Sequence, residues 1–94
     1  MDAKEVLRRY AAGERNFRQQ DLRGLSLVNA NLTGIDLTGA NLNNTDLSGS
    51  DLSNSNLNWV SLKGANLSKA NLSRVKMPDG RMHNDRLESA NYFG

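Results

Sequence analysis

The residues that could support acid–base or metal chemistry are few. His83 is the only histidine of the 94-residue chain, and Asp79 and Asp85 are carboxylates close to it in sequence. Three residues beside a turn are a weak signal for a metal site, and no second base stands at a spacing typical of a catalytic dyad or triad. The chain has no cysteine, which excludes thiol catalysis, zinc fingers and disulfides. We therefore expect no enzyme: no catalytic, cofactor-binding or metal-binding residue, and no small-molecule substrate.

Side chains suited to protein recognition are easier to identify. Trp59 lies two residues after a leucine of the repeat described below, at a position expected to face outward, and an exposed tryptophan is a typical anchor of a protein interface. The alternative is a ring lying flat over Gly39. The two aromatic residues at the C-terminal end either cover a free edge or join two copies end to end as a homodimer. The candidate interface residues are Trp59, Tyr92, Phe93, Arg81 and Arg86.

One leucine in every five residues is the dominant pattern of the sequence. The uninterrupted series is Leu22, Leu27, Leu32, Leu37, Leu42, Leu47, Leu52, Leu57, Leu62, Leu67 and Leu72. Its register extends back to Phe17 and forward through Met77, Met82, Leu87 and Tyr92. The residue before each leucine is usually Asn, Asp or Ser, the residue two before is small or β-branched, and the residue two after is often Gly or Asn. The unit therefore reads A-(N/D)-L-x-x, and a repeat this regular argues against disorder.

Neither regular element accommodates a period of five. On a helix the leucines would scatter around the cylinder, and on a straight strand they would alternate between faces. A chain that bends once per unit keeps every leucine inside, and Gly and Asn tolerate the positive φ that such bends require. We therefore expect a solenoid whose leucines, with the residues two before them, point inward. Asparagines stacked between coils are expected to hydrogen-bond along the stack.

Residues 15–94 resemble the pentapeptide-repeat family, whose A-(D/N)-L-x-x units they match in register. The stretch 10–17, leading into 21–24, is similar to the opening of cyanobacterial members. The resemblance implies an all-β solenoid, a right-handed quadrilateral β-helix in which four pentapeptides form the sides of each coil. Sixteen units then give about four coils, in a column roughly 19 Å tall at about 4.8 Å per stacked strand.

The two ends of a solenoid need caps, because they expose apolar cross-section and unpaired edges. Residues 1–13 are predicted to form a capping helix, with a capping box at Asp2 and Glu5 and a stop at Gly13. Its apolar positions are Ala3, Val6, Leu7, Tyr10 and Ala11. A membrane-surface or partner-binding helix is the functional alternative.

The C-terminal end departs from the repeat. Residues 14–94 form the predicted β-helix, but its last coil, 75–94, is irregular: 77–80 read as a turn, and basic residues replace the usual Asn or Asp. Either this coil is distorted and caps the column, or residues 78–84 form a turn and the chain re-enters the register at Leu87.

Composition and charge narrow the function. Hydrophobic residues make up 37% of the chain, which suffices when two residues in five point inward. No stretch is long enough for a membrane span, and the N-terminus lacks the apolar core of a signal peptide, so a cytoplasmic protein without membrane contact is expected. The net charge is only +2, and the sequence lacks the dense stripe of basic residues typical of a nucleic-acid binder. Basic residues near both ends either protect the edges and aid solubility or meet an acidic partner.

We expect a non-enzymatic scaffold or protein-interaction module with an unidentified protein partner and no cofactor. The family resemblance also implies a second possibility, modulation of DNA gyrase by DNA mimicry. Short length and a near-neutral to basic charge disfavour that alternative, because such mimics are longer, acidic dimeric rods.

Overall fold

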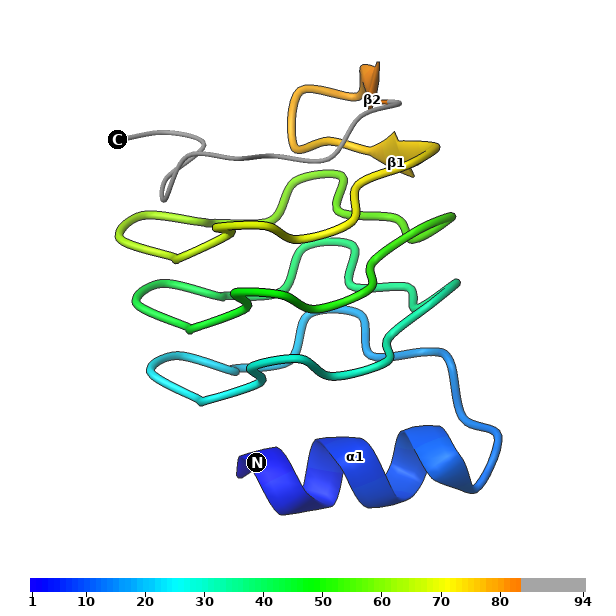
Figure 1. Ribbon diagram of the computed structural model, residues 1–94, viewed down its shortest axis with the longest axis vertical. Helices are drawn as coiled ribbons and strands as arrows, with labels where there is room; N and C mark the ends of the chain where they lie inside the picture. The colour runs from blue at the N-terminus through cyan, green and yellow to red at the C-terminus, as the bar shows by residue number, and fades with distance from the viewer. Residues whose placement is uncertain (84–94) are drawn as a thin grey trace.

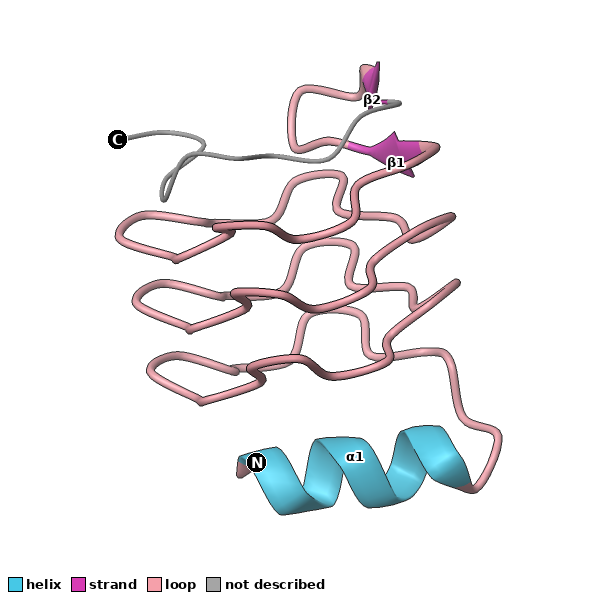
Figure 2. Cartoon of the chain, in the orientation of Figure 1, coloured by secondary structure: helices cyan, strands magenta, loops and turns pink. Residues whose placement is uncertain are grey.

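Stacked coils with a helix across one end make up residues 1–83, the described part of the computed structural model (Figure 1). Helix α1 (Ala3–Ala11) lies at one end of the stack. At the other end, β1 (Val75–Lys76) and β2 (Met82–His83) form an antiparallel hairpin. The coils are coloured as loop in Figure 2, because their paired residues form isolated bridges rather than continuous strands.

Residues twenty apart are paired throughout the stack. Parallel bridges begin with Asn16 and Asp36 and recur every five residues up to Lys76. Backbone hydrogen bonds also join the neighbouring coils. The Leu22 N–H, for example, donates to the Asn41 carbonyl of the next coil at 2.9 Å. A coil is therefore twenty residues long. We name the coils by their residues: coil 1 is 16–35, coil 2 is 36–55 and coil 3 is 56–75.

A type II turn follows the leucines of the coils from Leu27 to Leu72. The carbonyl of Leu27 accepts a hydrogen bond from the N–H of Ala30, three residues later, at 3.2 Å, and the residue before Ala30 has a positive φ. We call this positive-φ residue, two after each leucine, the corner residue. Most corners are Gly or Asn, as the repeat predicts. The exceptions, with φ between 55° and 63°, are Gln19, Trp59, Lys69 and Arg74.

The Asn or Asp before a leucine supports the turn of its own coil. Its side-chain oxygen accepts a hydrogen bond from the N–H two residues later, as Asp46 does from Ser48 at 3.0 Å. The expected asparagine ladders along the stack are therefore mostly replaced by bonds within one coil. Asn43 is an exception: its Oδ1 accepts from the Lys63 N–H of coil 3 at 2.9 Å, because Ser61 stands where Asn or Asp would otherwise do so.

The predicted leucine register fills the interior. Every leucine of this register, from Leu22 to Leu72, is buried, together with Phe17 below and Met77 above. The residue two before each leucine is buried from Ile35 to Val75, as predicted, but the equivalent residues before Ile35 are only half-buried or exposed. Three of these inward residues are polar: Thr45, Ser50 and Ser55. The hydroxyls of the first two donate to backbone carbonyls, whereas the Ser55 Oγ has no hydrogen-bond partner.

Helix α1 packs against the coil 1 end of the interior. Asp2 is its N-cap and accepts from the Glu5 N–H at 2.8 Å, but the Glu5 carboxylate bonds to Arg8, so only half of the predicted capping box forms. Val6 is fully buried and belongs to the same cluster as the leucines. The predicted apolar face is too wide, since Leu7 is 40% exposed.

The Tyr10 hydroxyl donates to the carbonyl of Thr33 in coil 1 at 2.5 Å. In the coils above, the equivalent carbonyl accepts from a backbone N–H of the coil below; that of Ser53, for example, accepts from Gly34. Tyr10 therefore supplies, for Thr33, the donor that a further coil would have supplied.

The regular stack ends at the β1–β2 hairpin. The Met77 N–H donates to the Arg81 carbonyl at 2.7 Å, and the Gly80 N–H donates back to the Met77 carbonyl at 2.8 Å, so the chain reverses direction at the predicted turn. The prediction that Met82 continues the inward register is wrong, because this residue is 60% exposed. The expected re-entry at Leu87 lies outside the described residues.

Candidate interaction surface

Trp59 is the most exposed large apolar side chain among the described residues. It is 77% exposed and occupies a corner with φ 63°. Its backbone is fixed from above, because its N–H donates to the Pro78 carbonyl at 3.2 Å. A side chain with a Cβ is disfavoured in this left-handed conformation, so the chain holds a large ring outward at a position better suited to Gly or Asn.

The ring of Trp59 does not lie flat over Gly39 as the alternative would require, since it is 77% exposed. The side chain nearest to Gly39 comes from coil 1: a Cβ at Gly39 would meet Gln19 Cγ at 3.2 Å. The tryptophan thus extends from the column with its apolar surface open to solvent.

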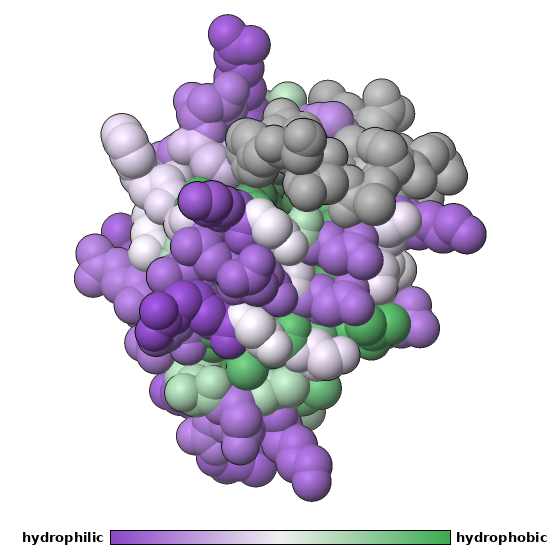
Figure 3. All heavy atoms as spheres, turned by 90° about the vertical axis from the view of Figure 1, so that its left-hand side faces the viewer, coloured by the Kyte–Doolittle hydropathy of each residue, from purple (hydrophilic) through white to green (hydrophobic). Residues whose placement is uncertain are grey.

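Hydrophobic surface also appears close to α1. Figure 3 shows one face covered mostly by hydrophilic side chains, with hydrophobic side chains toward the helix end. Leu7 and Val28 are 40% and 43% exposed, about half the exposed fraction of Trp59. Neither combines exposure with a positive φ, so Trp59 is the stronger candidate for an interface anchor.

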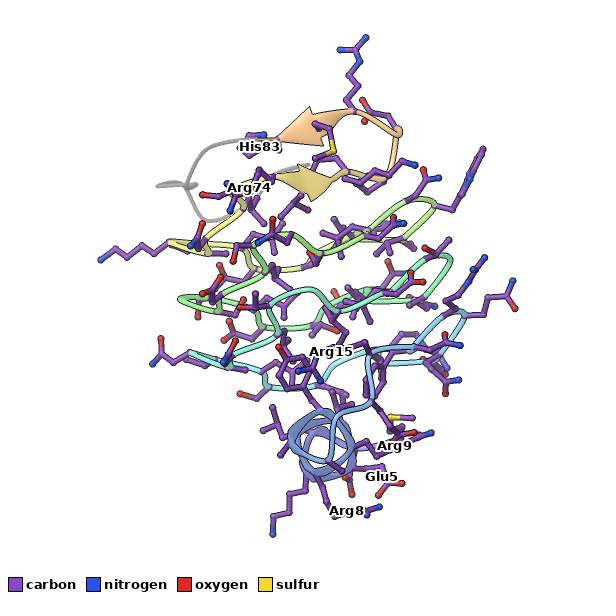
Figure 4. All side chains as sticks on the ribbon, turned by 90° about the vertical axis from the view of Figure 1, so that its right-hand side faces the viewer. Glu5, Arg8, Arg9, Arg15, Arg74 and His83 are labelled. Atoms are coloured by element: carbon purple, nitrogen blue, oxygen red, sulfur yellow. The ribbon has the colours of Figure 1, made fainter. Side chains whose placement is uncertain are left out.

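The basic residues around α1 are largely engaged with carboxylates. Arg8 bonds to Glu5 at 2.6 Å and Arg9 to Glu14 at 3.0 Å. The bond to Glu5 raises the pKa of Arg8 above its usual value. Arg15 stacks on Tyr10, 3.6 Å from the ring centroid. Figure 4 shows these residues at the α1 end, with Arg74 and His83 at the other. The α1 arginines thus act mainly in local structure.

Coil 1 carries a further pair, Arg23 and Asp21, at 2.8 Å. The hydrogen bonds from Arg23 lower the pKa of Asp21 below its usual value. Both residues line an open depression together with Met1, Gly24 and Asn44. Since the two charges satisfy each other, the depression offers neither a free general base nor a cluster of metal ligands.

The predicted residues near the hairpin are only partly described. The Arg81 side chain is 87% exposed and lies 3.6 Å from the Asp79 carboxylate. His83 is in β2, and no group of three metal-ligating side chains occurs within residues 1–83. Asp85, Arg86, Tyr92 and Phe93 lie outside the described residues. The expected end-to-end homodimer therefore stays a prediction.

Sequence reasoning missed a set of basic residues that the coils bring to two adjacent levels. Three belong to coil 3 and the fourth follows it directly. They are Lys63, Lys69, Arg74 and Lys76. A charge count over long segments conceals them, because the aspartates of coil 2 cancel them. A count over successive twenty-residue windows would have found them.

No helix among residues 1–83 is long and apolar enough to cross a membrane. Within these residues, the features that stand out chemically are the exposed tryptophan and the surrounding cations, and neither forms a catalytic arrangement.

Comparison with known proteins places these features in a family. The family model described as pentapeptide repeats matches in eight copies, over residues 16–39, 40–79 and 55–91. The crystal structure of alr5209, a pentapeptide-repeat protein from Nostoc PCC 7120, is similar at 36% identity and a TM-score of 0.64, covering 79% of this chain and 69% of that one. Such neighbours imply a right-handed β-helix.

The structure of HetL, a pentapeptide-repeat protein from the same cyanobacterium that is involved in heterocyst differentiation regulation, is similar at 35% identity and a TM-score of 0.56. The match covers 80% of this chain but only 42% of HetL. No curated protein matches the chain.

Proposed function

Because this chain belongs to the pentapeptide-repeat family, we propose that it is a non-enzymatic protein-interaction module, a rigid column that presents Trp59 to a protein partner. The observation that carries the proposal is the combination of 77% exposure and a φ of 63° at Trp59. A non-glycine residue in this conformation costs about 1–2 kcal/mol, and burial of the outward ring offsets at most about 1 kcal/mol of that. A large apolar ring held in solvent with no net structural gain fits a residue kept for binding.

We also propose two details of the fold of this module, the shape of its coils and the role of α1. Pairing every twenty residues with a turn every five supports a quadrilateral coil. Buried Val6 and the Tyr10 bond to the Thr33 carbonyl support a capping role for α1. Such a column has a fixed shape, so its binding residues are pre-organised and lose little freedom when a partner binds.

The test is affinity capture from a lysate of the source cell, followed by cross-linking and mass spectrometry. Wild type is compared with Trp59→Asn, which removes the ring but suits the positive φ. The matched control is Val28→Ser, which removes a smaller exposed apolar side chain elsewhere. We expect a partner that cross-links near Trp59 and is retained by wild type and by Val28→Ser but lost by Trp59→Asn. Equal capture by all three proteins would contradict the proposal.

A further inference from the structure

Adjacent coils carry opposite charge. Coil 2 has three acidic residues and no basic one, a net charge of −3; coil 3 has three basic residues and no acidic one, a net charge of +3. The acidic set is Asp36, Asp46 and Asp51, and the basic set is Lys63, Lys69 and Arg74, with Lys76 directly after it. We call these four cations together with Trp59 the basic band. It encircles the column at the level of coil 3 and the residue that follows it.

The lysines of the basic band differ in their partners from four arginines outside it. Four arginines outside the band each form an ion pair with a carboxylate: Arg8, Arg9, Arg23 and Arg81. Within residues 1–83, no ion pair involves Lys63, Lys69 or Lys76. Their charge is therefore free to meet an external anion, with no internal pair to break first.

The corners of the basic band are conformationally costly. Trp59, Lys69 and Arg74 have φ values of 63°, 60° and 55°. Coil 2, by contrast, has Gly or Asn at each of its corners: Gly39, Asn44, Gly49 and Asn54. Long side chains at three corners of one coil cost about 1–2 kcal/mol each in backbone conformation. Coil 2 shows that the stack does not require them.

Two of the cations are near the tryptophan along the coils. Lys63 follows Trp59 by four residues, on the next side of the same coil. Lys76 is bridged to Asn56, which precedes Trp59 by three residues, so Lys76 lies in the coil above on the same side as Trp59. An apolar ring with cations on the neighbouring side and in the next coil suits a ligand with a hydrophobic contact and nearby negative charges.

We propose that the part of the basic band around Trp59, with Lys63 and Lys76, binds a short extended acidic segment of a partner protein, with Trp59 as the apolar anchor. This inference rests on the proposed function and names the chemistry of its partner. The height of the band favours a peptide over nucleic acid. One coil occupies about 4.8 Å along the axis, the spacing of one extended strand. A nucleic-acid duplex, whose major groove alone is about 12 Å wide, would also cover the aspartates of coil 2 and be repelled.

The probe is a short synthetic peptide with a central Leu flanked on both sides by alternating Glu and Thr. It is titrated at low salt and followed by the fluorescence of Trp59, the only tryptophan of the chain. We expect saturable binding that changes the Trp59 emission and weakens with added salt. Lys63→Glu should weaken binding about tenfold. The matched control is Lys4→Glu, the same charge change on α1, which should alter affinity less than about twofold.

Three results would overturn the inference: no binding at low salt, equal weakening by Lys63→Glu and Lys4→Glu, or tighter binding of single-stranded oligothymidine than of the peptide through the same lysine. The proposed function would be contradicted by a different result. If a captured partner depends on Trp59 but not on Lys63, the interaction module stands and the acidic partner is wrong. If capture does not depend on Trp59, the module itself is wrong.

Discussion

Replacing Trp59 by asparagine should leave the stability of the protein nearly unchanged. Asparagine adopts the left-handed conformation readily, so the change relieves about 1 kcal/mol of backbone cost. The lost burial is small. With the side chain 77% exposed, the ring contributes on the order of 50 Å² of buried surface, or about 1 kcal/mol at 25 cal/mol/Å². The two terms nearly cancel, so the net change in stability should lie within about 1 kcal/mol of zero.

Thermal unfolding followed by circular dichroism measures this change without relying on tryptophan emission. A gain of 1 kcal/mol corresponds to about 4–8 °C in Tm for a domain of this size. Trp59→Ala is the matched control, because it removes the same ring but keeps a side chain that disfavours positive φ. Trp59→Ala should therefore be about 1 kcal/mol less stable than Trp59→Asn.

Two outcomes would refute this reasoning. If Trp59→Ala equals Trp59→Asn in stability, the left-handed conformation is not costly at this corner. If Trp59→Asn loses more than about 2 kcal/mol, the ring packs in the folded protein and cannot be a freely displayed anchor.

Three further substitutions test the stack. Gly49→Ala should destabilise the protein by up to about 1 kcal/mol more than Gly34→Ala in urea unfolding, because both have positive φ but only at Gly49 would the new Cβ meet the side-chain oxygen of Asn29 in the coil below and force that side chain to another rotamer; equal losses would exclude a steric contribution. Ser55→Ala should stabilise by about 1 kcal/mol in the same assay, since it removes a buried hydroxyl without a partner; a loss would mean that the hydroxyl is satisfied. Tyr10→Phe should lower stability by about 1 kcal/mol and speed amide exchange in coil 1, because it removes the bond to a carbonyl of that coil; unchanged exchange would argue against a capping role for this hydroxyl.

The sequence predicts which residues fill the interior because each five-residue unit corresponds to one bend of the backbone. A leucine at every fifth position has one simple geometric solution, and the corners with Gly or Asn mark where φ becomes positive. Family membership and burial of Leu22 to Leu72 agree with that prediction. The prediction of buried residues fails where the sequence departs from the repeat. Met82 keeps the spacing, yet the turn after Met77 reverses the chain and leaves Met82 exposed.

The interaction surface is less predictable, because it depends on pairs that are distant in sequence. Trp59 could be placed outward from its position after Leu57. Whether its ring would cover Gly39 could not be predicted, because the side chain that approaches this glycine comes from Gln19, forty residues before Trp59. The basic band likewise appears only when the charges are grouped by coil.

The twenty-residue coil with a turn every five also separates what holds the protein together from what it displays. Insertion of one A-(N/D)-L-x-x unit within the column would leave every later leucine inside, because the inward register is renewed every five residues. The same insertion would shift each later outward residue by one side, a quarter turn about the axis relative to α1. Gain or loss of single units can therefore reorient a binding surface in fixed angular steps without redesign of the core, a route to new specificity that few globular folds possess.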